Sequence, residues 1–141
     1  MTDIGEEIVR LSELIARCQP VMTALGDLTR QHIILSMMAA VPCERGLRVG
    51  EIAARANLSR PTVSHHLKIL KDCGIVRMRR DGTRNYYALD GDPTALDELI
   101  VMLTRARTLI ARPDIHHLPD ERDSTGDHDR MNSHHHEGAE R

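Results

Sequence analysis

Six of the nine histidines in this 141-residue chain lie beyond residue 115, where aspartates are interleaved with them. Imidazole and carboxylate groups together suit Ni(II), Co(II) or Zn(II) rather than Cu(I). The candidate metal ligands are those nearest to the last predicted helix: Asp114, His116 and His117. A second interpretation stays open, because polar, acidic, His-rich ends are often disordered and bind metal adventitiously.

A second group of chemically active residues is basic and lies in the middle of the chain. Residues 45–84 contain ten Lys and Arg against three Asp and Glu, a formal charge of +7, although the whole chain carries −2. From residue 112 onward, four Arg stand against eight Asp and Glu. Cationic side chains at this density bind the phosphate backbone of nucleic acids. The sequence therefore predicts a basic nucleic-acid-binding region followed by an acidic tail.

Two helices separated by a short turn must position the first half of this basic region. Apolar residues at helical spacing predict a helix over residues 49–56, and residues 57–59 interrupt it. Ser59 can cap a second helix with Pro61 in its first turn, where the missing N–H costs nothing. Gly74 ends that helix in the usual place for a left-handed cap.

A β-hairpin is predicted directly after the second helix. Two β-rich runs, residues 75–80 and 83–89, are joined by Asp81-Gly82, a strong hairpin signal. Tyr86 and Tyr87 should alternate between the two faces, so that one is in the core and the other faces solvent or phosphate. Helix, turn, helix and hairpin form the order of a winged helix-turn-helix, an architecture that reads DNA.

Three further helices are predicted around this reading unit. The first runs from Ile4 to about Ile15 and stops before Pro20. The second covers residues 28–40, is capped by Asp27, and is so apolar on all sides that it should be buried centrally. The last lies between residues 93 and 112.

We therefore expect a mainly α fold with a small β-hairpin: a winged helix-turn-helix of about five helices and a two-stranded wing. The first and last helices are more apolar than a small winged helix needs. Homodimerisation through them would set two reading helices one DNA turn apart on a double-stranded, inverted-repeat operator. Residues 1–111 should form this DNA-binding and dimerisation domain, and residues 112–141 an acidic, His-rich, disordered tail.

The second helix of the reading unit should enter the major groove. Its outward side chains should contact bases and flanking phosphates through Arg60, Thr62, Ser64, His65 and Lys68. The wing should hold the adjacent backbone or minor groove through Arg79, Arg80, Arg84 and Asn85. His66 lies nearer the apolar stripe and should pack instead.

From about Val21 to Ile110 the sequence resembles the ArsR/SmtB family of metalloregulatory repressors. The landmarks are Ala-Leu-Gly-Asp-Leu-Thr-Arg at 24–30, Ser-His-His-Leu-Lys-Ile-Leu at 64–70, Gly-Ile-Val at 74–76 and the wing at 82–89. Family members usually have Pro where Leu28 stands. The resemblance implies a homodimeric repressor that leaves its operator when an inducer binds.

The effector sites of that family are missing from this sequence. Where the arsenic and cadmium sensors have Cys-x-Cys, this chain has Leu-Arg-Val-Gly-Glu at 47–51. Cys73 matches the second cysteine of some cadmium/lead sensors, but Ile69 replaces the first. The cysteine pair of the sulfide sensors and the last-helix histidines of the zinc and cobalt sensors are also absent. Some nickel/cobalt members recruit histidines beyond the last helix, and the tail histidines of this chain could act in the same way. The other possibilities are a non-metal effector or no effector.

Other function classes fit the sequence less well. No activated nucleophile, carboxylate pair or phosphate-cradling glycine loop stands out, so we expect no enzyme. A His-rich metal-buffering protein, the alternative from another class, would not need the basic winged helix. Cys18, Cys43 and Cys73 form no C-x-x-C pair. No apolar run reaches the roughly 20 residues of a membrane span, and the acidic N-terminus is unlike a signal peptide, so we expect a cytoplasmic protein with no membrane partner.

Overall fold

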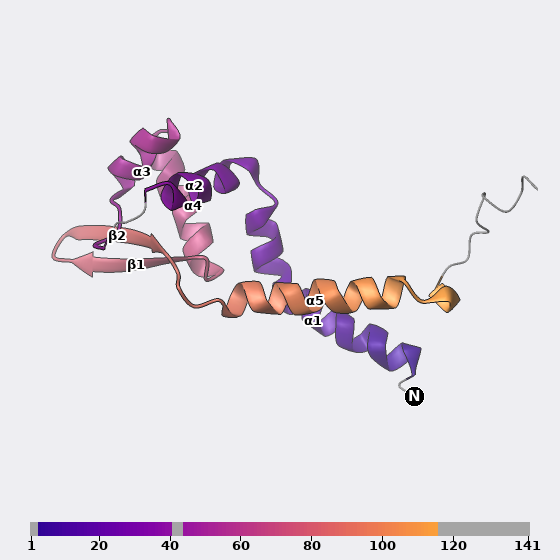
Figure 1. Ribbon diagram of the computed structural model, residues 1–141. Coiled ribbons are helices and arrows are strands. Elements are labelled where there is room, and N and C mark those ends of the chain that lie inside the picture. The colour runs from indigo at the N-terminus through magenta and orange to yellow at the C-terminus, as the bar shows by residue number, and fades with distance from the viewer. Residues whose placement is uncertain (1–2, 41–43, 116–141) are drawn as a thin grey trace, which may run out of the picture.

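The computed structural model describes residues 3–40 and 44–115, which form five α-helices and one two-stranded antiparallel sheet. Figure 1 shows one lobe made of α2, α3, α4 and the hairpin, with α5 packed along α1 beside it. The predicted combination of five helices and a two-stranded wing is confirmed. The elements in chain order are α1 (Ile4–Leu25), α2 (Leu28–Met38), α3 (Val49–Ala56), α4 (Arg60–Asp72), β1 (Val76–Asp81), β2 (Arg84–Leu89), α5 (Thr94–Ile110) and a 3₁₀ turn (Pro113–Ile115).

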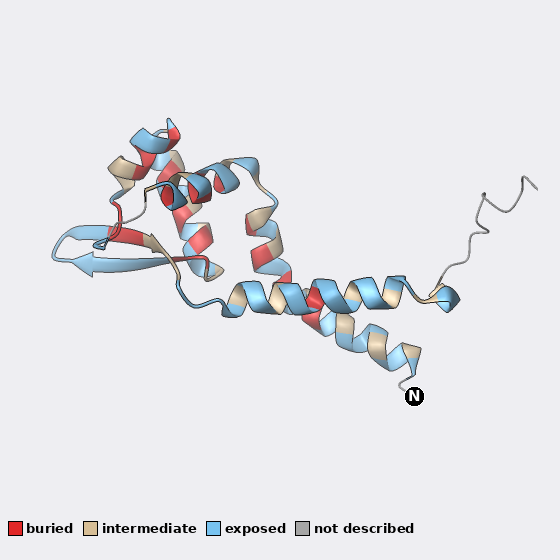
Figure 2. Ribbon diagram, viewed as in Figure 1, coloured by how far each residue is buried: buried red, intermediate tan, exposed pale blue. Residues whose placement is uncertain are grey.

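The main core lies between α2, α3, α4 and the start of the hairpin, and Figure 2 shows most buried residues in this lobe. Val63, Leu67 and Leu70 of α4 point inward at helical spacing and are fully buried. Burying one such side chain contributes about 1.5–3 kcal/mol relative to leaving it in water. The inner face of α4 is therefore held firmly, and its opposite face is left to solvent.

A smaller core joins α1 to α5, which run antiparallel. Leu14, Cys18 and Met102 are buried there. Leu99 packs against both this cluster and the main core, so the helix pair is tied to the reading lobe. Met102 is the single buried residue of α5, and most apolar side chains of that helix face solvent.

The first helix is longer than the sequence predicts, because α1 continues through Pro20 to Leu25. A proline inside a helix removes one backbone hydrogen bond and often bends the helix, and Figure 1 shows α1 changing direction along its length. The helix continues because Val21 and Ala24, beyond the proline, are buried in the main core. Tertiary packing thus outweighs the local stop signal.

The second helix is buried on one side only, so the expected all-round burial is wrong. Ile33 and Met37 pack into the core, whereas Leu35 is 63% exposed and Leu28 and Met38 are also exposed. Asp27 caps the helix as predicted by accepting a hydrogen bond from the backbone N–H of Arg30 at 2.9 Å. The helix ends at Met38, two residues before the predicted end.

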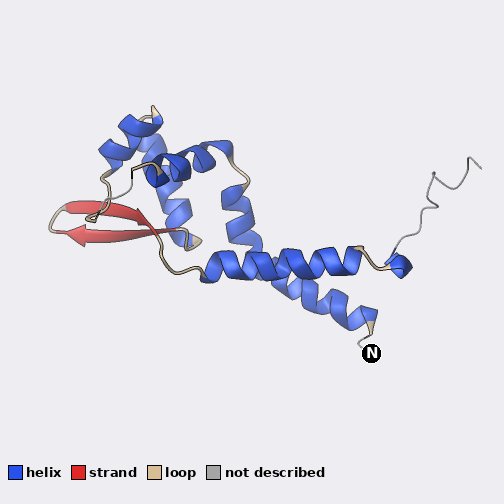
Figure 3. Cartoon of the chain, in the orientation of Figure 1, coloured by secondary structure: helices blue, strands red, loops and turns tan. Residues whose placement is uncertain are grey.

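The wing is the single hairpin of strands seen in Figure 3. Its base pairs Val76 with Leu89, and Gly82 lies in the turn with φ of 60°. The expectation that one tyrosine faces outward is wrong, because Tyr86 and Tyr87 are each 9% exposed. Tyr87 packs in the main core. Tyr86 points to the other face, where the guanidinium of Arg79 lies 5.0 Å from its ring centroid. The long side chain of Arg79 therefore helps to cover the Tyr86 ring, which the alternation of side chains along the strand would otherwise expose.

Candidate DNA-binding interface

The recognition helix α4 is anchored at its N-terminus by Ser59. The Ser59 Oγ accepts from the backbone N–H of Thr62 at 3.3 Å and donates to Thr62 Oγ1 at 2.8 Å. Pro61 lies in the first turn, as predicted. Asn57 adopts a left-handed conformation with φ of 55°, which ends α3 and turns the chain toward α4. These local contacts set how α4 leaves the turn.

The outward face of α4 carries Ser64, His65 and Lys68, all exposed. This is the arrangement in which a helix offers donors and acceptors to base edges in a major groove. Thr62 is half-buried and its hydroxyl is engaged by the cap. A base contact by Thr62 would therefore compete with the cap. The DNA contacts of these side chains stay predictions.

An open groove of about 470 Å³ lies between the start of α3, the start of α4 and the tip of the wing. It brings together Arg60, Arg84 and Asn85, three residues that were expected to contact DNA, and adds Arg48. Arg48 directly precedes α3, whose first backbone N–H groups also favour anions. Three guanidinium groups around one groove are suited to a backbone phosphate.

Gly50 makes room for the guanidinium of Arg60 inside this groove. A Cβ atom at Gly50 would lie 2.8 Å from Nη2 and 3.0 Å from Cζ of Arg60, which is too close. The missing side chain therefore lets Arg60 lie against the first turn of α3. Sequence reasoning missed Arg48 and Gly50. The available signal was a glycine within a short helix, which costs about 1 kcal/mol relative to alanine and so points to a packing reason.

Two residues of the wing that were expected to contact DNA, Arg79 and Arg80, make contacts within the protein. Besides covering Tyr86, Arg79 donates to the carbonyl of Arg45 at 3.3 Å and lies 3.9 Å from Asp81. Arg80 Nε donates to the carbonyl of Gly82 at 3.2 Å. These arginines are therefore aligned along the hairpin, with part of their donors already engaged.

The candidate metal ligands are described only in part, because His116 and His117 lie outside the described residues. Asp114 accepts from Arg112 through both oxygens, at 3.1 and 2.9 Å, and the same guanidinium lies 3.0 Å from Glu7 of α1. The hydrogen bonds from Arg112 lower the pKa of the Asp114 carboxyl. Asp114 is thus a carboxylate that Arg112 must release before it can bind a metal.

No group of three or more His, Cys, Asp or Glu that could hold a metal ion occurs in residues 3–40 and 44–115. Cys18 is buried, and Cys73 is half-buried with its Sγ donating to the carbonyl of Leu70. Burial raises the pKa of the Cys73 thiol, which disfavours the thiolate that soft metals require. Cys43 lies outside the described residues.

The middle of the sequence matches known bacterial regulatory proteins. A family model described as bacterial regulatory protein, arsR family, matches residues 30–78. The HTH-type transcriptional regulator Rv2034 of Mycobacterium tuberculosis is 45% identical over 82 residues, which cover 58% of this chain and 70% of that protein. The chain belongs to the ArsR family.

Further matches agree with this ArsR assignment. A probable mercury resistance operon repressor of Streptomyces lividans is 41% identical over 83 residues, covering 58% of this chain and 59% of that protein. The crystal structure of an ArsR family transcriptional regulator, RHA00566, superposes with a TM-score of 0.55 at 19% identity over 69% of this chain and 94% of that one. That last likeness speaks to the fold alone.

The ArsR assignment decides the class of function. This protein is a DNA-binding transcriptional regulator and not an enzyme, as predicted. A metal-buffering protein is therefore the weaker of the alternatives. Within the described part of the chain, no helix is long and apolar enough to cross a membrane.

Proposed function

We propose that this ArsR protein is a homodimeric repressor that binds an inverted-repeat operator through α4 and the wing of each subunit. The observation that carries the proposal is the exposed apolar surface of α1 and α5. Ile100 and Leu103 are 60% and 55% exposed, and the same helices also expose Ile8, Val9, Leu96, Val101 and Ile110. Exposed apolar surface of this extent is typical of a protein–protein interface.

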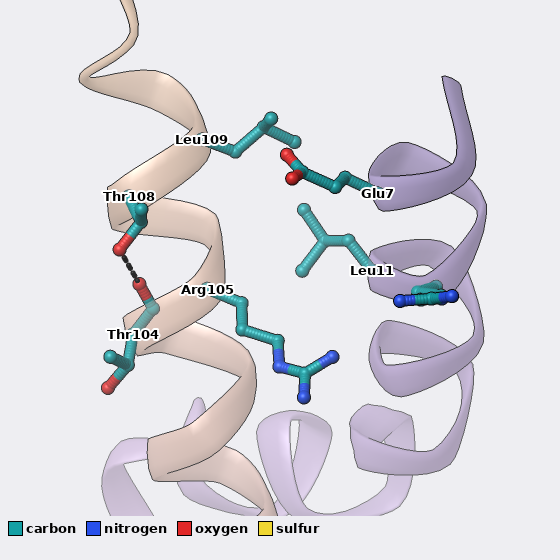
Figure 4. Close-up of a pocket in the computed structure, with 7 residues that line it drawn as sticks. Glu7, Leu11, Thr104, Arg105, Thr108 and Leu109 are labelled. Carbon is teal, nitrogen blue, oxygen red and sulfur yellow. Dashed lines mark hydrogen bonds between the residues drawn. The ribbon is translucent and has the colours of Figure 1, made fainter. Parts of the chain in front are cut away.

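A second copy of the chain is the partner that this surface fits best. Near Glu7, α1 and α5 leave a groove of about 290 Å³, into which Arg105 extends beside the half-buried Leu11 and Leu109 (Figure 4). Two-fold pairing of these helices would cover the apolar side chains. It would also present two copies of α4 to successive major grooves, which doubles the base pairs read and gives the selectivity a monomer lacks.

Within each subunit we infer a division of labour between bases and phosphates. Ser64, His65 and Lys68 read base edges from the outward face of α4. Arg48, Arg60 and Arg84 bind a backbone phosphate in the groove beside α3. The set is completed by the remaining predicted contacts: Thr62, Arg79, Arg80 and Asn85.

Charged substitutions on α5 test the dimer. Ile100→Glu combined with Leu103→Glu is expected to give a folded monomer, because two carboxylates cannot be buried in an apolar interface. Light scattering after size exclusion measures the mass, and anisotropy with operator DNA should show at least about a hundredfold weaker binding, the loss expected without the second reading head. Leu35→Glu on the exposed face of α2 is the matched control and should leave the dimer intact. A dimeric α5 variant beside a monomeric Leu35→Glu would place the interface on α2 instead.

For the effector, we propose Ni(II), Co(II) or Zn(II) held by Asp114, His116 and His117. The donor set suits these metals, and the similarity to a probable mercury resistance operon repressor supports regulation by a metal. Residues 1–111 would be the reading and dimerisation domain, with the tail starting one residue later. Arg112 forms an ion pair with Glu7 of α1. If a metal drew Asp114 away from Arg112, the change would therefore be transmitted to the helices proposed to form the dimer. The alternative is an ArsR regulator with a non-metal effector or none.

Removal of residues 113–141 is expected to abolish metal-dependent release from the operator. Each metal is added to the protein–operator complex, and bound DNA is followed by anisotropy for the full and the truncated chain. The control replaces His134, His135 and His136 by alanine. This change removes the histidine run that could bind metal adventitiously but keeps the proposed ligands. Undiminished release after truncation would exclude the tail as the sensor. A full chain that ignores all three metals would favour the non-metal alternative.

A further inference from the structure

Arg30 is the buried charged residue of the part of the chain that the structure describes, with 8% of its surface exposed. Its Nε donates to the carbonyl of Ala24 at 2.9 Å, and its Nη2 donates to the carbonyl of Thr23 at 3.0 Å. Asp27 lies 4.0 Å from the same nitrogen. A buried guanidinium is tolerated only when its donors are satisfied. Two of the three nitrogens join the end of α1 to the start of α2.

The remaining guanidinium nitrogen reaches the recognition helix. Nη1 of Arg30 lies 3.3 Å from Nδ1 of His66 in α4, 36 positions along the chain. His66 is half-buried, and its ring centroid is 5.3 Å from that of the exposed His65. We propose that Arg30 is a positioning residue for DNA reading, which holds α4 in a defined orientation relative to α1 through His66. The inference rests on the proposed contact of α4 with DNA.

This contact supplies what the core beneath α4 does not. Leu67 and Leu70 set which side of α4 faces the core, but apolar packing is non-directional and so tolerates small rotations of the helix about its own axis. A hydrogen bond is directional. Because His66 is adjacent to His65, a rotation that broke the bond to Arg30 would also displace a proposed base-reading side chain. Arg30 thereby ties the reading helix to α1, one of the two helices proposed to set the spacing of the dimer.

The contact requires a neutral His66. A guanidinium has donors only, so Nδ1 must accept, and a protonated ring has no acceptor. Burial lowers the pKa of His66 from its ordinary value of 6.5. The charge of Asp27, the N-cap of α2, raises this pKa, whereas the charges of Arg30 in α2 and His65 in α4 lower it further. With the pKa lowered in the folded protein, the contribution of the contact is complete above pH 6.5 and is lost as the pH falls below it.

The test compares the pH dependence of operator binding for the full chain, His66→Asn and His32→Asn. The Asn amide oxygen can accept from Arg30 in place of Nδ1 but does not titrate. His32 is an exposed histidine of α2 outside the reading surface, with Nε2 2.9 Å from the carbonyl of Ala56. Anisotropy is measured at constant ionic strength between about pH 8 and about pH 5.5, and thermal unfolding at both ends verifies that each variant is folded. His65 is present in all three proteins, so its own titration cancels.

The wild type and His32→Asn are expected to lose roughly tenfold more affinity than His66→Asn between these pH values, the order of magnitude of one lost hydrogen bond to a charged group. At the upper pH, His66→Asn should bind nearly as well as the wild type, because the amide restores the acceptor. Superimposable pH profiles for the wild type and His66→Asn would overturn the inference. Absence of operator binding by every protein at every pH would instead overturn the proposed DNA recognition, and the positioning role with it.

Discussion

Replacing Arg30 with methionine is expected to lower the free energy of unfolding by about 3 kcal/mol, because a buried, fully paired cation is removed. The change leaves the carbonyls of Thr23 and Ala24 without their donor and deprives Asp27 of its nearby cation. Methionine fills much of the same volume, so the loss reports on the hydrogen bonds rather than on a cavity. Urea denaturation followed by circular dichroism measures the difference.

Arg55→Met is the matched control for this prediction. Arg55 is an exposed arginine in the last turn of α3. Exposed substitutions of this kind change stability by less than about 0.5 kcal/mol. Both variants must be compared with the wild type at one protein concentration, because the proposed dimerisation would make the apparent stability concentration-dependent. An Arg30→Met protein as stable as Arg55→Met would mean that the Arg30 hydrogen bonds contribute nothing net to the fold.

The second large effect concerns the arginine groove beside α3. Simultaneous replacement of Arg48, Arg60 and Arg84 by alanine is expected to weaken binding to any DNA by at least about a hundredfold at low salt. The salt dependence should flatten as well, because each lost phosphate contact removes about 0.9 from the slope of log K against log salt. Anisotropy titrations at four or five salt concentrations give both quantities.

Single substitutions separate the groove from the base-reading face. Arg84→Ala and Arg48→Ala should each reduce the salt slope by about one while keeping the preferred sequence. Lys71→Ala carries the same charge change at the far end of α4 and should leave the slope unaltered. His65→Ala should shift sequence preference, measured by selection from random DNA, more than it changes the slope. If Arg48→Ala behaved like Lys71→Ala, the groove would not be a phosphate site.

Much of the reading unit was predictable because its signals are local. Ser59 directly precedes α4 and caps it through the backbone N–H of Thr62, three residues later. Asn57 and Gly74 adopt left-handed conformations at helix ends, and Gly82 does so in the turn of the wing. Such preferences depend on one or two backbone dihedrals and on hydrogen bonds within a single turn, so composition and spacing are enough to find them. The exposed face of α4 followed from the same periodicity, because burying Val63, Leu67 and Leu70 determines which side faces out.

The structural predictions that were wrong concern residues whose environment is set by tertiary packing against distant parts of the chain. Pro20 is a stop signal locally, yet α1 passes it because Val21 and Ala24 are buried by other elements. The apolar composition of α2 could not reveal that Leu35 would lie on the exposed side of the helix. Tyr86 is buried because Arg79 reaches over from the adjacent strand.

The basic centre of the sequence was sufficient to indicate phosphate-binding cations, whereas the metal ligands predicted at the histidine-rich end stay a prediction. Helix caps, turn residues and apolar spacing in the sequence predicted the winged helix, and its positive charge predicted the DNA-binding class. Tertiary structure alone decided that Arg60 lies against Gly50 in a groove also lined by Arg48, and that Arg30 reaches His66. Those contacts join residues 10 and 36 positions apart. Only the packing of whole helices against one another brings such residues within hydrogen-bonding or van der Waals range.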